Sequence, residues 1–325
     1  MNNAIINNSR WIRDFLGRQN GAMLALIVLW IVAMFFIPQF RTGSNHITII
    51  RQSAIPMVGA MGMMFVLISG GIDLSAGFTV GFVSAILGIF MADERFMYPV
   101  WIAVLLALII GGSFGAINGL LVARAKIPSF ITTLGMGFII FGLINIITDG
   151  NTTNRLPASF VAIGRTQILG LPSMVYIAAA VLLIGAFILN KTTFGRSLFS
   201  CGMNQKASFL SGLNVNRTIM TPYVINGLCA AVVGILLTIR VNSAQPDMGG
   251  SAYNFEAITA AVIGGVSLFG GRGRVSDCVF GVLIIKLLEN CITILNITPH
   301  IYRAVLGVII LAALIFDMTR KKSLS

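Results

Sequence analysis

The sequence predicts an all-α integral membrane protein, on the strength of its charge content, its hydropathy and its apolar runs. Of the 325 residues, 57% are hydrophobic and only 10% are charged, and the mean hydropathy is +0.93. A soluble globular chain carries roughly 25% charged residues, so this chain has too little polar surface to cover a water-facing particle. Its apolar runs approach the ~20 residues that cross a bilayer as a helix. These observations exclude a soluble enzyme, a disordered chain and a disulfide-stabilised scaffold.

The apolar runs predict about ten transmembrane helices. They lie at 21–38, 53–69, 77–92, 98–122, 129–148, 172–189, 219–239, 257–269, 278–296 and 301–317. The eighth run is too short to cross on its own at about 1.5 Å per residue, so short and glycine-interrupted helices are expected. No low-complexity linker divides the chain. One transmembrane domain is therefore expected over 21–317, between a terminal segment at 1–20 and a tail at 318–325.

Basic residues predict the orientation of these helices. If every run crosses and the N-terminus lies inside, about twice as many Lys and Arg residues fall inside as outside, as the positive-inside rule requires. Without the eighth crossing, Arg320, Lys321 and Lys322 would fall outside. Ten crossings therefore fit better, with 1–20 and 318–325 both in the cytoplasm. The net charge of +12 is then explained by orientation in lipid, and no nucleic-acid partner is expected.

Glycines are placed at positions where helices meet or break. Gly111, Gly115 and Gly119 recur every four residues in the fourth run, which predicts a small-residue face for close helix packing. Segments 70–77 (GGIDLSAG) and 264–271 (GGVSLFGG) share the pattern GGxxLxxG. Glycine-interrupted apolar segments at matching places in two halves often flank the substrate path of a transporter.

Asp73 is the most informative single residue, because it lies within an otherwise apolar stretch at 61–91. A carboxylate in hydrocarbon is expensive and normally faces a polar cavity or a partner. Two interpretations remain open. Either Asp73 or Ser75 caps a helix that begins near Leu74 after the glycine break, or Asp73 lines or gates a transport path.

Two other charged positions allow alternative interpretations. Glu256 opens the eighth run, where it either suits the positive end of a helix dipole or belongs to a broken helix that lines a path. Lys286 and Glu289 are three residues apart in the ninth run, so they share a helix face and are expected to neutralise each other.

The polar stretch at 190–217 contains a predicted two-turn helix at Asn204–Gly212, with Gly212 as its stop. It is either a surface loop helix or a helix presented to a cytoplasmic partner. The sequence contains no GxxxxGK[ST] loop, so the chain is not expected to hydrolyse nucleotide itself. His46 and His300 are the only histidines, and the four cysteines form no CxxC pair. Neither a metal site nor an enzyme active site is therefore expected.

Several separated motifs carry a resemblance to a known family. They are 70–77 (GGIDLSAG), 193–196 (TFGR), 210–215 (LSGLNV), 243–246 (SAQP) and 256–265 (EAITAAVIGG). In this order they resemble the permeases of ribose-type ABC sugar importers, from about Gly21 to Asp317. The closing segments 296–299 (NITP) and 315–317 (IFD) are similar to arabinose and ribose members in particular.

The resemblance implies a ten-helix permease with a vitamin-B12-importer-like fold in a bacterial cytoplasmic membrane, carrying a pentose or related monosaccharide. Its partners would be a second permease (the same chain or a sister), an ABC ATPase that holds ATP and Mg, and an extracytoplasmic sugar-binding protein. The chain itself would bind no cofactor. A stand-alone secondary transporter is the alternative; it would need membrane carboxylates or histidines for ion coupling, and only Asp73 and Glu289 lie within runs.

Two groups of site residues follow from the motifs and the resemblance. The expected path or gate comprises Gly70, Gly71, Asp73, Ser75, Asn254, Glu256 and Thr259. The expected ATPase-coupling helix comprises Asn204, Gln205, Ala207, Ser211 and Gly212. The chain departs from the family at Gln205-Lys206, where Glu-Ala is usual, and at Glu256, where Asp is commoner.

Overall fold

The computed structural model describes residues 21–92 and 96–298, with isolated positions up to 311. The helices are α2 (Gly21–Phe36), η1 (Pro38–Arg41), α3 (Gly43–Ile68), α4 (Ala76–Ala92), α5 (Val100–Ala123), α6 (Ser129–Thr148), α7 (Ala158–Arg165), α8 (Ser173–Lys191), α9 (Thr193–Met203), α10 (Gln205–Leu210), α11 (Val215–Val241), α12 (Gly250–Gly264) and α13 (Val275–Ile294). A small antiparallel hairpin joins β1 (Gln167–Ile168) to β2 (Leu171–Pro172). The predicted all-α class is confirmed apart from this hairpin. The predicted segment 1–20, most of the tenth run at 301–317 and the tail 318–325 lie outside the described residues.

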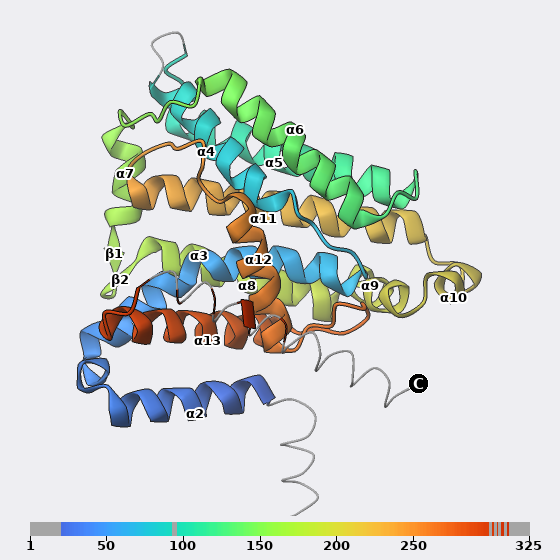
Figure 1. The fold of residues 1–325 in the computed structure, drawn as a ribbon. Coiled ribbons are helices and arrows are strands. Elements are labelled where there is room, and N and C mark those ends of the chain that lie inside the picture. Colours follow the sequence, from blue (N-terminus) through green and yellow to red (C-terminus); the bar gives the residue numbers. More distant parts are fainter. Residues whose placement is uncertain are drawn as a thin grey trace, which may run out of the picture.

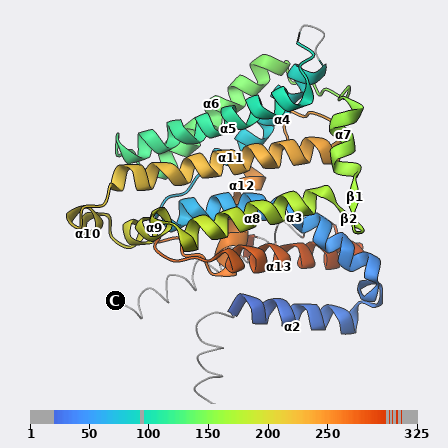
Figure 2. The same cartoon turned by 180° about the vertical axis from the view of Figure 1, so that it is seen from behind.

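The long helices lie side by side, and α12 runs across them between α11 and α13 (Figure 1). The upper layer of that view holds α4, α5 and α6, and α2 lies below α13 at the opposite side. Seen from behind, α8 lies in front of α3 (Figure 2). α7 and the hairpin lie at one end of the bundle, called here the hairpin end, and α9 and α10 lie at the other, called here the α10 end.

Within the described ranges, α3, α5, α6, α8 and α11 are long and apolar enough to cross a membrane. α2 and α4 are apolar but shorter. Large apolar side chains point outward from the bundle, such as Phe138 and Ile146 on α6 and Leu183 on α8. The architecture is that of a multi-pass membrane protein, and the count of ten crossings stays a prediction.

Several helix boundaries differ from the apolar runs. α3 begins at Gly43, ten residues before the second run, because the Thr42 side chain accepts a hydrogen bond from the Asn45 amide and caps it. α12 begins at Gly250, seven residues before the eighth run, and ends at Gly264. The polar stretches 149–170 and 190–217 contain the short helices α7, α9 and α10.

The predicted small-residue face on α5 is confirmed as a contact with α11. A side-chain carbon added to Gly111, Gly115 or Gly119 would collide with the α11 backbone. Their nearest α11 atoms include the carbonyl oxygens of Gly227, Tyr223 and Met220, respectively. Close backbone approach therefore holds these two helices together, as expected where lipid provides no hydrophobic drive between helices.

Candidate functional site

A non-helical segment, residues 69–75, joins the end of α3 to the start of α4 and returns into the bundle (Figure 1). Gly70 has φ +84°, a backbone conformation that glycine adopts without strain, and so permits the turn after α3. The segment carries Asp73 into the interior, where its exposed fraction is 1%. Irregular backbone at membrane depth is tolerated only where protein groups or a polar cavity satisfy its amides and carbonyls.

Side chains of α6 and α12 supply these hydrogen bonds. Thr133 Oγ1 accepts from the Leu74 amide at 3.0 Å, and Ser129 Oγ accepts from the Ile72 amide at 3.2 Å. Asn254 Oδ1 accepts from the Gly77 amide at 2.6 Å, and its Nδ2 donates to the Leu74 carbonyl. The break in the helix is therefore stabilised by side chains that come from far along the chain.

Neutral donors surround the Asp73 carboxylate. Oδ1 accepts from the Ser75 amide at 2.9 Å and from Ser75 Oγ at 2.7 Å. Oδ2 accepts from Asn226 Nδ2 on α11 at 2.9 Å. Ser75 Oγ in turn accepts from Asn118 Nδ2 on α5 at 2.7 Å. No ion pair involves Asp73 within the described part of the chain.

The Asp73 junction is defined here as Asp73, Ser75, Asn118, Thr133, Asn226 and Asn254, all buried. The predicted helix start near Leu74 is confirmed to within two residues, because α4 begins at Ala76. Asp73 accepts from the Ser75 amide, one residue before this start, so it holds the backbone that leads into α4. Its second oxygen also binds Asn226, which a cap does not need. Its role in transport stays a prediction.

A second polar cluster joins α12 to α13. Lys286 Nζ lies 2.7 Å from Glu256 Oε1 and 2.7 Å from Glu289 Oε2. We call these three residues the Lys286 cluster. The predicted pairing of Lys286 with Glu289 is confirmed. The first-turn interpretation of Glu256 is wrong, because α12 begins six residues earlier and the Glu256 carboxylate contacts α13.

The remaining predicted path residues occupy other places. Gly70 and Gly71 form the turn after α3, and Gly71 lies against the buried Tyr223 ring, where a side-chain carbon would collide with the hydroxyl. Thr259 is buried on α12, and its hydroxyl donates to the Phe255 carbonyl of the same helix. The structure therefore brings Asp73, Ser75 and Asn254 together and places Glu256 and Thr259 elsewhere on α12.

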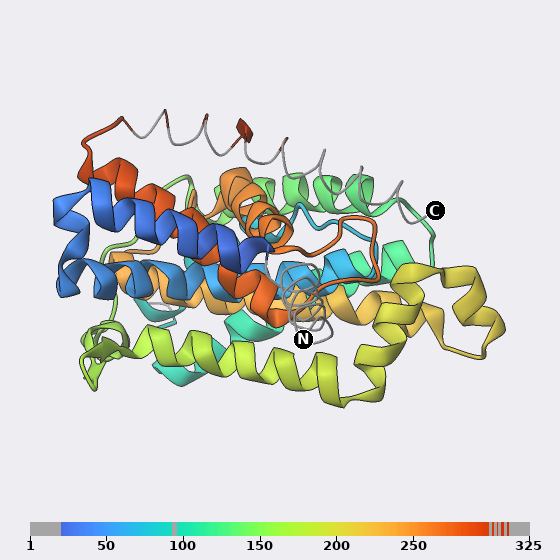
Figure 3. The same cartoon turned by 90° about the horizontal axis from the view of Figure 1, so that it is seen from below.

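The predicted helix at Asn204–Gly212 is confirmed as α10, which extends beyond the long helices (Figures 1 and 3). The Asn204 side chain caps it by accepting from the Ala207 amide at 2.9 Å. Gly212 has φ +81° and ends the turn. All five expected coupling residues are exposed: Asn204, Gln205, Ala207, Ser211 and Gly212. Phe209 and Leu210 add apolar surface at the same place.

α9 links this exposed helix to two non-helical segments, residues 69–75 before α4 and residues 265–274 between α12 and α13. Gly202 near the end of α9 packs so closely on the Ile68 carbonyl and the Gly271 amide that a side chain would collide with both. The Gly271 amide donates to the Ile68 carbonyl at 2.9 Å, and Gly270 lies against Gly70. Both segments with the GGxxLxxG pattern thus meet beneath α9.

Sequence reasoning missed Asn118, Thr133 and Asn226. Each is a polar residue within an apolar run, and polar side chains within membrane helices normally face the bundle interior. That signal was available for the asparagines. It does not tell which of several such residues meet, because their separations along the chain are 43 residues or more.

A bundle of apolar helices around a hydrogen-bonded, non-helical segment is typical of a membrane transport protein. The chain belongs to the family described as "Branched-chain amino acid transport system / permease component", which matches residues 45–314. The resemblance to the permeases of ribose- and arabinose-type ABC sugar importers is confirmed by relatives of similar length.

The chain is 38% identical to the L-arabinose transport system permease protein AraH of Escherichia coli (strain K12), over 94% of this chain and 92% of that protein. It is 39% identical to the ribose import permease protein RbsC of Bacillus subtilis (strain 168), over 93% of each. It is 34% identical to the D-allose transport system permease protein AlsC of Escherichia coli (strain K12), over 90% and 89%. These relatives are transport permeases and not enzymes. No solved structure matches the chain.

Proposed function

We propose that this chain is the membrane-spanning permease subunit of an ATP-driven importer for a monosaccharide, either a pentose or a related sugar. The Asp73 junction is the observation that carries the proposal, because it places a hydrogen-bonding site within an apolar bundle. The relatives that name arabinose, ribose and allose support a sugar as the solute. All three are small, uncharged and rich in hydroxyl groups.

The junction has the chemistry of a gate on the path of an uncharged solute. The bond from Asn226 to Asp73 connects the non-helical segment to α11. The bonds of Asn254 with the backbone at Leu74 and Gly77 connect this segment and the start of α4 to α12. A transport cycle needs contacts that form in one conformation and break in another. Each 1.4 kcal/mol of differential stabilisation shifts the two populations by about tenfold. Loss of these hydrogen bonds would free the non-helical segment before α4 from both neighbours.

Coupling to an ATPase is assigned to α10. The helix is exposed, carries the apolar side chains Phe209 and Leu210, and continues from α9, whose Gly202 lies against Gly271 and against Ile68, directly before the segment that holds Asp73. Movement of α10 by a partner would therefore act on the segment that holds Asp73. The change to Gln205-Lys206 fits an ATPase dedicated to this permease.

The remaining parts of the assembly follow from the family. ATP and Mg would be held by the ATPase, a second permease would complete the path, and an extracytoplasmic binding protein would deliver the sugar. The α10 end would face the cytoplasm, because it carries Lys126, Lys191, Arg196 and Arg217, in accord with the positive-inside rule. Both termini would lie on that side of a bacterial cytoplasmic membrane.

The test is uptake by vesicles that contain the chain with an ABC ATPase and sugar-binding protein from the same cell, using ribose, L-arabinose and D-allose. Ala207→Trp adds bulk to the exposed face of α10 and should lower ATPase association and uptake without lowering membrane insertion. Ala125→Trp, at an exposed position in the loop between α5 and α6, is the matched control. ATPase association and uptake at the wild-type level in Ala207→Trp would contradict the coupling assignment. Uptake that persists without any ATPase would favour a secondary transporter instead.

A further inference from the structure

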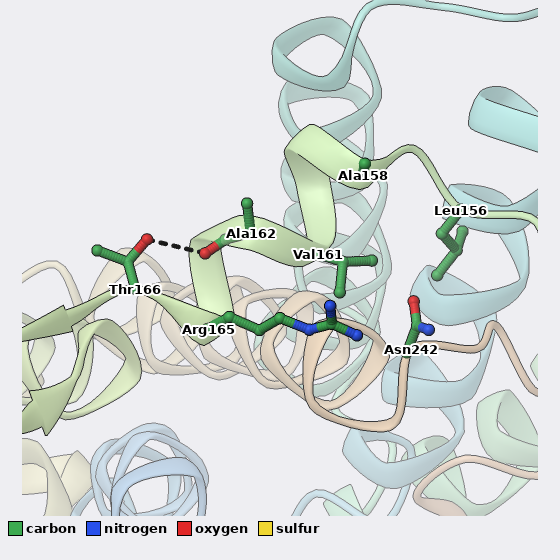
Figure 4. A pocket seen from close by; sticks show the side chains of 7 residues that line it. All are labelled: Leu156, Ala158, Val161, Ala162, Arg165, Thr166 and Asn242. Carbon is green, nitrogen blue, oxygen red and sulfur yellow. Dashed lines mark hydrogen bonds between the residues drawn. The ribbon is translucent and has the colours of Figure 1, made fainter.

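Two adjoining cavities lie at the hairpin end, among α3, α7, α8 and α11. Their volumes are about 500 Å³ and about 330 Å³, and both are lined by Val161, Arg165 and Asn242. In Figure 4 the Arg165 side chain extends from the end of α7 toward Asn242. The function proposed above does not use this site.

The smaller cavity is strongly cationic, and the larger cavity shares Arg165 with it. Arg51 of α3 and Arg240 of α11 line the smaller cavity together with Arg165. All three are exposed, and within the described part of the chain none of their side chains makes a hydrogen bond or an ion pair. No Asp or Glu lines either cavity. Three guanidinium groups of like charge repel one another, so an anion bound between them would be stabilised.

The position of the cavities along the helices points to the boundary between membrane and water. The lining includes Pro172, directly before α8, and Arg240, one residue before the end of α11. Two apolar spans thus begin and end at this level. Phospholipid headgroups occupy this depth of a bilayer.

The site is amphipathic, which distinguishes it from a site for a free anion. Met174, Val175 and Ile239 form part of the wall beside the arginines. Ile47 and Ile50 are exposed on α3, on the turn that carries Arg51. A ligand with a phosphate and hydrocarbon chains would satisfy both surfaces at once.

We propose that this site binds the headgroup of an anionic phospholipid, with Arg51, Arg165 and Arg240 around the phosphate. Guanidinium groups match phosphate oxygens by paired hydrogen bonds and are weakly hydrated, so arginine suits such a site. Basic pockets between membrane helices bind anionic headgroups at the cytoplasmic face of membranes, and the same attraction between arginine and phosphate acts at the hairpin end. The acyl chains lie along the apolar surface of α3.

The test uses the full-length chain in detergent and measures lipid binding by native mass spectrometry and thermal shift. Phosphatidylglycerol is compared with phosphatidylcholine of the same acyl chains and with water-soluble glycerol phosphate. Phosphatidylglycerol should bind best. Arg165→Gln should weaken its binding roughly fivefold, and neutralising all three arginines roughly a hundredfold, because each basic residue near an anionic headgroup contributes about 1 kcal/mol.

Arg155→Gln is the matched control, since Arg155 is exposed at the same end but lines neither cavity. Weaker phosphatidylglycerol binding by Arg165→Gln, with wild-type binding by Arg155→Gln, supports the proposal. Equal binding of both lipids, or equal loss in both variants, overturns it. Glycerol phosphate that binds as tightly as the lipid overturns the assignment to a lipid and leaves a soluble-anion site. Unchanged lipid binding in the triple variant, together with lost association of an acidic partner protein, overturns it in favour of protein docking.

Discussion

The Asp73 junction and the Lys286 cluster place buried charge in the same bundle in two different ways. The junction distributes one carboxylate among neutral donors and draws on α4, α5, α6, α11 and α12. The cluster opposes one ammonium to two carboxylates and joins only α12 and α13. Asn254 and Glu256, two residues apart on α12, bind to different neighbours. α12 is therefore held on one side by a neutral network and on the other by ion pairs.

The two kinds of contact predict different responses to substitution. A network of hydrogen bonds links many elements at once, and its members depend on one another. Breaking an ion pair inside a protein is costly because a charge is left without compensation, but the effect stays with the two helices involved. We therefore expect substitutions in the junction to affect transport more than stability, where shape is kept. Substitutions in the cluster should mainly affect stability.

The largest expected effect is at Asp73. Asp73→Ala leaves the Ser75 amide, the Ser75 hydroxyl and Asn226 Nδ2 without an acceptor, and unpaired buried donors cost about 1–3 kcal/mol each. The free energy of unfolding should fall by roughly 3 kcal/mol or more, measured by thermal unfolding in detergent.

Asp73→Asn separates charge from shape at the same position. Its oxygen can keep the Ser75 bonds, and the Asn226 amide can rotate to accept from the new amide group. Stability should fall by only about 1 kcal/mol. Uptake should nevertheless fall tenfold or more if the charge takes part in the cycle, since one decade is about 1.4 kcal/mol. Uptake near the wild-type level in this variant would leave a purely structural role for Asp73.

A smaller effect is expected at Lys286. Lys286→Met leaves Glu256 and Glu289 without their shared cation, and the loss should be about 2 kcal/mol after allowance for their partial exposure. Combining Glu256→Lys with Lys286→Glu keeps the same charges and should recover most of this loss in a thermal unfolding measurement. No recovery in the exchanged variant would show that the packing of Lys286, and not its ion pairs, stabilises the contact.

The smallest expected effect is at Glu289, whose side chain is 39% exposed. Glu289→Gln leaves the pair of Lys286 with Glu256 in place and removes the excess negative charge. The free energy of unfolding should change by no more than roughly 0.5 kcal/mol. A loss as large as that of Lys286→Met would show that all three charges act as one unit, which would remove the contrast with the junction.

Much of the fold was predictable, because membrane helices need long apolar runs and glycine at close contacts. Gly111, Gly115 and Gly119 identified the face that packs on α11, and Gly212 marked the end of α10. The start of α12 was missed because Ser251, Asn254 and Glu256 interrupt residues 250–256, which therefore form no continuous apolar run, and a helix that is shielded by neighbouring helices does not need an apolar beginning.

The order of residues along the chain is enough to establish an apolar helical bundle with one carboxylate, Asp73, at a glycine break. It also determined which family the chain resembles, through short motifs that stand at fixed places. The helical bundle and the family motifs can both be read from short stretches of sequence, since hydropathy, helix length and glycine breaks depend on neighbouring residues. Only the tertiary structure decided that Asn226 and Asn254 are the partners of the break and that Glu256 faces Lys286. Hydrogen bonds and ion pairs act over about 3 Å in space, whereas these partners are separated by 30 to more than 150 residues along the chain.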